Sequence, residues 1–137
     1  MNLKKIYLSI FAITLSVIAL LYGINPQWFT DTFLDTSMII HTDAAHILRA
    51  VSGLYLALIG FFIYGIFDEK YTDAAIVITA VFCFGLASGR SVSILFDGLP
   101  SPILLLYVFM EYSIVPIAYL LLKKTAATSS SHQVSLA

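Results

Sequence analysis

Four long apolar segments dominate this chain and limit what it can fold into. A helix needs about 20 mostly apolar residues to cross about 30 Å of hydrocarbon, and in lipid its backbone groups must be hydrogen-bonded within the segment. The sequence therefore predicts an all-α integral membrane four-helix bundle of residues 1–124, followed by a disordered, Ser- and Thr-rich tail of residues 125–137. The expected spans are residues 6–23, 45–67, 74–96 and 103–122.

The composition excludes several other classes of protein. Hydrophobic residues make up 60% of the 137 residues and charged residues 11%, whereas a soluble domain carries about 25% charged residues. Seven basic residues and a net charge of −1 provide no surface for nucleic acid. The single cysteine excludes a disulfide framework. The lipid bilayer is therefore the one partner that the composition requires.

The lysines predict the orientation of the chain in the membrane. Lys4 and Lys5 precede the first span, Lys70 lies between the second and third, and Lys123 and Lys124 follow the fourth. With four spans, these three places lie on one side. The connections on the other side carry acidic residues but no Lys or Arg. Because short loops rich in Lys and Arg stay in the cytoplasm, we expect both termini to be cytoplasmic.

The connection after the first span predicts a short interfacial helix. Asn25 can cap its start, and Pro26 suits its first position. Trp28, Phe29 and Phe33 are expected to share one side, and such aromatic residues favour the boundary between membrane and water. This helix is either a simple anchor in the boundary or a lid over a cavity on that side of the membrane.

Three charged residues stand inside the apolar segments, where each charge costs about 2.5–3.5 kcal/mol. Beyond Glu111 the last span retains only about 11 residues, or about 16 Å of helix, so Glu111 must lie at membrane depth. A third span that ends before Arg90 is too short for the same reason. Arg49 lies closer to the boundary. All three residues fall in the outer half of the bundle, away from the lysines.

We therefore predict a polar site in the outer half of the bundle. Its central residues are Arg49, Arg90 and Glu111, and its flanking candidates are His46, Ser93, Asp97 and Tyr107. Small residues are expected to bring the helix backbones close together around it. The candidate packing glycines are Gly53, Gly60, Gly85 and Gly89.

Two main interpretations of the charges are open. In the first, they form a purely structural network in which Arg90 pairs with Glu111, and the protein is an accessory or assembly subunit of a membrane complex. Arg49 then pairs with Asp97 or Asp43. In the second, two guanidiniums facing one carboxylate leave a surplus of positive charge. Since a guanidinium suits carboxylate and phosphate groups, the second interpretation predicts a pocket for a small anionic or lipidic ligand.

Catalysis and metal binding find less support in the residues. A membrane enzyme acting on a lipid-borne substrate, with Glu111 as general acid or base, has no catalytic motif behind it, and the sequence names no cofactor. His41 and His46 are five positions apart and diverge on a helix, so no metal site is predicted. Asp43 is expected to cap the second span instead. The small-residue faces of the second and third spans suit another membrane protein or a second copy of the chain.

Two stretches carry a resemblance to a known family. The first is H-x-x-R-A-x-x-G-x-Y, from His46 to Tyr55, and the second is G-R-x-x-S-x-x-x-D-G-x-P, from Gly89 to Pro100. Together with the span that carries Glu111, they resemble an uncharacterised bacterial four-helix membrane protein family, domain of unknown function 4345, over nearly the whole chain. The resemblance implies a multi-pass protein of the bacterial inner membrane and brings no activity with it.

Overall fold

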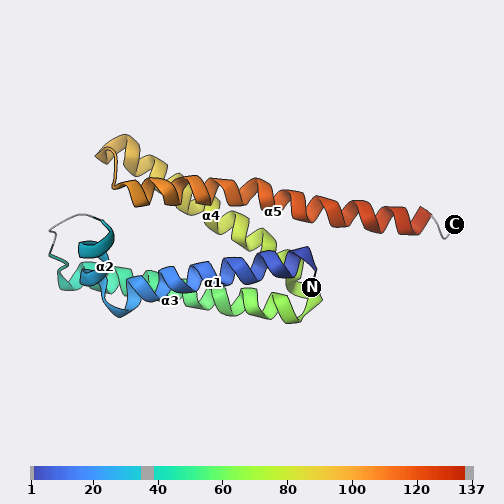
Figure 1. The fold of residues 1–137 in the computed structure, drawn as a ribbon, viewed down its shortest axis with the longest axis horizontal. Helices are drawn as coiled ribbons and strands as arrows, with labels where there is room; N and C mark the ends of the chain where they lie inside the picture. The colour runs from blue at the N-terminus through green and yellow to red at the C-terminus, as the bar shows by residue number, and fades with distance from the viewer. Residues whose placement is uncertain (1, 35–38, 135–137) are drawn as a thin grey trace.

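The computed structural model describes residues 2–34 and 39–134, with side chains as far as residue 123. Within these ranges the chain forms five helices, whose arrangement is shown in Figure 1. They are α1 (Leu3–Ile24), α2 (Pro26–Phe33), α3 (Thr42–Phe67), α4 (Glu69–Asp97) and α5 (Pro102–Val134). Four of them are long and apolar enough to cross a membrane, namely α1, α3, α4 and the Pro102–Lys123 part of α5. The predicted all-α four-helix membrane bundle is confirmed.

The short helix α2 begins as the sequence predicts. The Asn25 side chain accepts a hydrogen bond from the backbone N–H of Trp28 at 3.0 Å, and Pro26 stands in the first turn. Phe29 turns inward and packs edge-on against Tyr22 of α1, with ring centroids 4.6 Å apart. These contacts hold α2 against one end of the bundle. We call this end, which also contains the connection between α4 and α5, the outer end.

The starts of α3 and α4 differ. Asp68 caps α4, because its side chain accepts a hydrogen bond from the backbone N–H of Lys70 at 3.0 Å. The predicted cap at Asp43 is wrong. Because α3 already begins at Thr42, Asp43 lies inside its first turn, where a negative charge is still favourable beside the helix N-terminus.

The closest helix pair is formed by α1 and α3. A Cβ at Gly23 would lie 2.4 Å from Ser52 Oγ, and this hydroxyl donates to the backbone carbonyl of Ala19 at 2.7 Å. Gly65 permits a second close approach, to Ala75 of α4. Buried residues recur every three or four positions along both helices, as expected for one inward face. They include Leu8, Ala12, Leu15, Ala19 and Tyr22 of α1 and Ser52, Tyr55, Ile59 and Phe62 of α3.

The four glycines that were expected to pack helices together do not lie at these helix contacts. A Cβ at Gly53, Gly60, Gly85 or Gly89 would meet no atom of the described residues within 4 Å. All four positions are exposed, the first two on α3 and the other two on α4. The expectation of close backbone contact at these positions is therefore corrected. In an apolar helix, small residues alone do not indicate which side faces the bundle.

The second helix pair, α4 and α5, parts from the first towards the outer end. Figure 1 shows that α4 starts beside α1 and α3 and then crosses away from them. It ends at Asp97 and is followed by Gly98, whose φ of 94° is a left-handed conformation that glycine adopts without strain. The chain then turns back into α5, which is antiparallel to α4. Cavities lined by residues of both pairs lie at the level of the predicted site.

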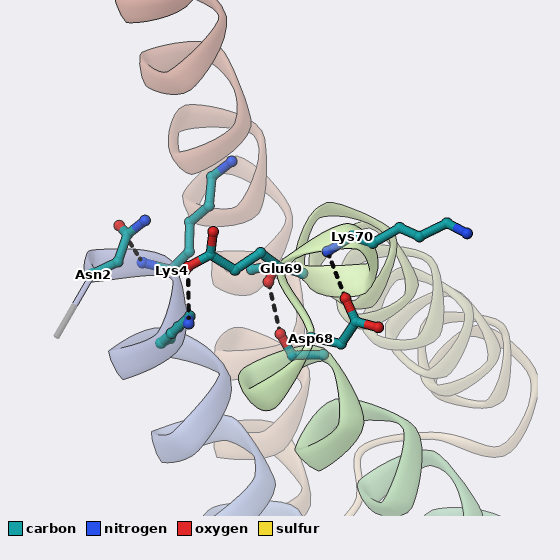
Figure 2. Close-up of polar contacts among 8 residues, drawn as sticks. Asn2, Lys4, Asp68, Glu69 and Lys70 are labelled. Carbon is teal, nitrogen blue, oxygen red and sulfur yellow. Dashed lines mark hydrogen bonds and ion pairs between the residues drawn. The ribbon is translucent and has the colours of Figure 1, made fainter.

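Ion pairs join the opposite end of the bundle, which we call the lysine end. Lys4 of α1 pairs with Asp73 of α4, and Lys5 pairs with Glu69 at 3.1 Å. Figure 2 shows Lys4 beside the start of α4 at Asp68 and Glu69. The Lys4 side chain is only 7% exposed, whereas the Asp73 side chain is 58% exposed, so the pair lies at the edge of the bundle. These contacts fix the start of α1 on the start of α4.

The distribution of the lysines matches the expected topology. Lys4, Lys5 and Lys70 lie at the lysine end, and Lys123 lies towards it because α5 is antiparallel to α4 (Figure 1). The side of the membrane that this end faces stays a prediction.

The sequence predicts a disordered tail after residue 124, and this disorder stays a prediction. The structure continues α5 through this segment as far as Val134. Once a helix is formed, each further residue adds one hydrogen bond at little extra cost, so α5 extends beyond its apolar part. The boundary predicted at residue 124 between a membrane domain and a tail stays a prediction, and residues 135–137 lie outside the described residues.

Candidate functional site

Arg90 of α4 and Glu111 of α5 meet in the outer half of the bundle. The Arg90 Nε donates to both carboxylate oxygens of Glu111, each at 3.2 Å. Their side chains are 23% and 13% exposed, so little of the pair is open to its surroundings. The structure thus brings together two of the three charged residues that the sequence singles out.

The phase of each helix explains why both side chains turn inward. On α4, Thr79, Cys83 and Ala87 are buried, and Arg90 follows three positions after the last of them. On α5, Glu111 lies one turn after Tyr107, a spacing that puts both on the same face. The pair therefore forms from helix geometry without help from a loop.

Tyrosines surround the pair. The ring of Tyr107 lies 5.6 Å from the guanidinium carbon of Arg90, a distance at which the cation and the aromatic face attract each other. Tyr22 of α1 lines the same spaces as Arg90, which brings α1 into the site. Nearby, the hydroxyls of Ser91 and Tyr112 are 3.0 Å apart and form a second link between α4 and α5.

An apolar cavity of about 300 Å³ extends from the pair towards the lysine end, and we call it the membrane cavity. Its walls come from α1, α4 and α5, with Tyr55 of α3. On α1 they extend from Tyr22 to Tyr7, which corresponds to about 22 Å of helix at about 1.5 Å per residue. Arg90 and Glu111 are the wall residues that carry a charge. The membrane cavity is therefore a long apolar space with a charged pair near one end.

The membrane cavity is open along one side. Ile10 of α1 is 61% exposed, and Met110 and Ile117 of α5 are 45% and 44% exposed, although all three contribute to its wall. These residues lie within segments that are long and apolar enough to span a membrane. In a bilayer, the open side between α1 and α5 faces lipid chains.

A second space of about 420 Å³ lies between α2, α3 and α4, and we call it the outer cleft. Phe29 of α2 contributes to its wall, and so do Gly85 and Gly89 of α4. The membrane cavity and the outer cleft share Tyr22, Tyr55, Leu86 and Arg90. Arg90 therefore stands where the two spaces meet.

Arg49 does not join this site, which corrects the expectation of three converging charges. Its side chain is exposed and belongs to the wall of neither space. Among the residues that the structure describes, no ion pair involves it. Helical phase explains this result, because Leu48, Ser52 and Tyr55 line the inner side of α3 and each residue turns the helix by about 100°. Arg49 consequently shares an outward face with Gly53.

The remaining candidates divide between the site and the surface. Tyr107 is in the site, as described. Ser93 donates a hydrogen bond to Asp97 at 2.7 Å, and both are exposed near the end of α4. His46 is exposed on α3. Within the described part of the chain, no three His, Cys, Asp or Glu side chains are grouped closely enough to hold a metal ion.

Two site residues escaped the sequence analysis. Tyr22 and Tyr55 are buried, and their rings lie with centroids 6.2 Å apart at the junction of the two spaces. The sequence does contain a signal that could have identified them. Each is a tyrosine, with a polar hydroxyl, on the inward face of an apolar span at the depth of Arg90. Such a residue needs a polar partner, and the charged pair lines the same cavity.

The fold and the site define this chain as a small multi-pass membrane protein, a four-helix bundle with a charged pair at the end of an apolar cavity. A family model described as "Domain of unknown function (DUF4345)" matches residues 3–122. The chain belongs to this family, as the two sequence stretches and Glu111 suggest. No curated protein and no solved structure matches it.

Proposed function

We propose that this protein binds a lipidic ligand in the membrane cavity, with the polar part of the ligand at Arg90 and Glu111. The observation that carries the proposal is the connection of a long apolar space to a single charged pair. A lipid combines one polar end with an apolar chain, so its two parts match the two parts of this space. Apolar walls with a few well-placed polar groups are typical of ligand sites.

The open side of the membrane cavity supports a lipid rather than a water-soluble molecule. A lipid can pass between α1 and α5 directly from the bilayer, without first entering water. Of the exposed wall residues, Ile10, Met110 and Ile117 are apolar and Thr14 adds a single hydroxyl, so this route is largely apolar. A polar solute would have to cross lipid to use the same opening, at a cost of several kcal/mol.

The charges also bear on the choice between a lipidic and a small anionic ligand. The anionic alternative depended on a surplus of positive charge from two guanidiniums. Arg49 lies on the outward face of α3, so the charges of Arg90 and Glu111 in the site cancel each other. The argument for a small anion therefore loses its basis, and the lipidic ligand is the one we propose.

Lipid analysis of the purified protein tests this proposal. Ile114→Trp places a large ring in the membrane cavity, while Leu120→Trp places the same ring on the lipid-exposed side of α5 and serves as the control. After purification in mild detergent, we expect native mass spectrometry to detect a bound lipid in the wild type and in Leu120→Trp, but not in Ile114→Trp. An identical lipid content in all three proteins would refute lipid binding in this cavity.

An accessory role in a membrane complex is a second candidate, and one observation favours it. The outward face of α3 carries Arg49, Gly53 and Gly60, and small residues in lipid allow another helix to approach closely. A photo-crosslinking residue at Gly53 should then capture one specific protein or a second copy of the chain in native membranes. The same probe at Leu120 is the control, and equal, unspecific capture at both positions would contradict this role.

We further propose that the membrane is the inner membrane of a bacterium and that the lysine end faces the cytoplasm. The distribution of lysines and the family resemblance support this location. A labelling experiment that tests it is given in the Discussion.

A further inference from the structure

We propose that the polar part of the ligand is an uncharged, flat ring that carries carbonyl oxygens, the chemistry of a membrane quinone with a single apolar tail. The ring occupies the outer cleft beside Arg90, and the tail lies in the membrane cavity. This inference rests on the proposed lipid binding and specifies the head group.

Charge balance at the pair disfavours an ionic head group. An anionic group would lie close to the Glu111 carboxylate and a cationic group close to the Arg90 guanidinium, in surroundings that screen charge poorly. An uncharged carbonyl avoids both repulsions. A guanidinium has five N–H donors, and the Nε of Arg90 is the one bonded to Glu111. Its terminal NH₂ groups provide donors suited to a carbonyl oxygen.

The wall of the outer cleft suits a flat ring. Gly85 and Gly89 are one helical turn apart, so α4 presents bare backbone to the cleft there. A Cβ at either position would meet no described atom within 4 Å, which shows that there is free space beside them. The aromatic rings of Tyr22 and Tyr55 line the same cleft. Since aromatic rings pack favourably on one another, a planar head group has a glycine surface on one side and aromatic partners nearby.

The dimensions of the membrane cavity favour one tail. Its volume of about 300 Å³ is at the lower end of the range for small-molecule sites, about 300–1,000 Å³. Its length along α1, about 22 Å, exceeds the half-thickness of about 15 Å of the hydrocarbon layer. A narrow space of this length fits a single extended chain better than the paired chains of a phospholipid.

Four probes with the same decyl tail test the head group: a decyl benzoquinone, decanol, decanoate and decyl phosphate. Binding to the full-length protein in detergent is followed by the rise in melting temperature with each probe. Quenching of the single tryptophan, Trp28 of α2, provides a second readout for the quinone. We expect the quinone to bind at least about ten-fold more tightly than the other three probes.

Two variants locate the ring. Gly89→Leu fills the outer cleft, and Gly53→Leu adds the same side chain on the outward face of α3, at a position that is equally free of neighbours. We expect the quinone affinity to fall about ten-fold or more in Gly89→Leu and to be unchanged in Gly53→Leu. The comparison of the four probes on the wild-type protein does not depend on either variant folding.

The possible results separate the two proposals. If decanol, decanoate or decyl phosphate binds as tightly as the quinone, the proposal of a flat, uncharged ring is refuted. Provided that Ile114→Trp still abolishes binding, the proposed lipid site survives that result. If no probe binds to the wild type, or if Ile114→Trp leaves binding of every probe unchanged, both proposals are refuted.

Discussion

Replacing Glu111 by Gln should destabilise the bundle more than replacing Arg90 by Gln. The arginine left by Glu111→Gln keeps its charge, because a guanidinium does not lose its proton in a protein. The carboxyl group left by Arg90→Gln can instead take up a proton and become neutral. Both side chains are mostly buried, so the remaining group cannot simply turn to water. Glu111→Gln therefore leaves an unpaired buried charge, whereas Arg90→Gln leaves a buried carboxyl group that can become neutral.

The expected magnitudes follow from the geometry of the pair. Removing one partner of a fully buried ion pair costs about 3–5 kcal/mol, but Arg90 is 23% exposed and borders two open spaces. We therefore expect a loss in free energy of unfolding of about 2–3 kcal/mol for Glu111→Gln and about 1–2 kcal/mol for Arg90→Gln. The loss in free energy of unfolding of the double variant should be about 1–2 kcal/mol smaller than the sum of the losses of the two single variants, because both single changes break the same contact.

Reversible unfolding measures these values. The purified variants are titrated with sodium dodecyl sulfate in mixed micelles, and helix content is followed by circular dichroism. Asp97→Asn is the control, because Asp97 lies exposed on the same helix and bonds to Ser93 instead. Additivity of the two single changes to within about 0.5 kcal/mol, or a larger loss for Arg90→Gln than for Glu111→Gln, would refute the reasoning.

Three further predictions concern the rest of the bundle. Gly65→Ala should lower the free energy of unfolding by about 1–3 kcal/mol in the same titration, because the new Cβ would lie 2.8 Å from the Cβ of Ala75. Gly60→Ala is the control and should cost nothing, because a Cβ there meets no described atom within 4 Å. Equal effects of the two changes would contradict the described packing. Thr72→Val should cost about 1 kcal/mol, since the buried Thr72 hydroxyl donates to the carbonyl of Gly65 at 2.7 Å, and unchanged stability would show that this bond contributes nothing. In a cysteine-free background in intact cells, a membrane-impermeant maleimide should label Asp97→Cys but label Lys70→Cys only after lysis, and the reverse pattern would invert the proposed orientation.

Local features of the sequence were sufficient to predict most of the fold. Span length follows directly from the thickness of the hydrocarbon layer, and the start of α2 follows from Asn25 and Pro26. The meeting of Arg90 and Glu111 was also within reach, because the depth of each residue can be counted from its helix end. Two opposite charges at a similar depth on adjacent helices have a strong reason to pair.

The orientation of each residue around its helix was harder to predict. In a membrane the lipid-facing and bundle-facing sides are both apolar, so the usual contrast that reveals the buried face of a helix is absent. This is why the sequence could not show that Arg49 faces outward, or that Gly23 and Gly65 pack while Gly53 and Gly60 do not. Such assignments depend on which helices become neighbours, and no single segment contains that information.

Within the described part of the chain, the ion pairs that join the two helix pairs lie at the lysine end. Ion pairs from Lys4 and Lys5 hold α1 to α4 at the lysine end, and the hydroxyls of Tyr7 and Thr79, 2.6 Å apart, add a further link. Beyond these contacts the pairs diverge (Figure 1), so we expect the α4–α5 pair to pivot about the lysine end. We expect lateral pressure in the surrounding leaflet to bring the two pairs together at the outer end, and a bound lipid between them to oppose this closure. If the proposed lipid binds there, its affinity should vary with the tension and lipid packing of that leaflet.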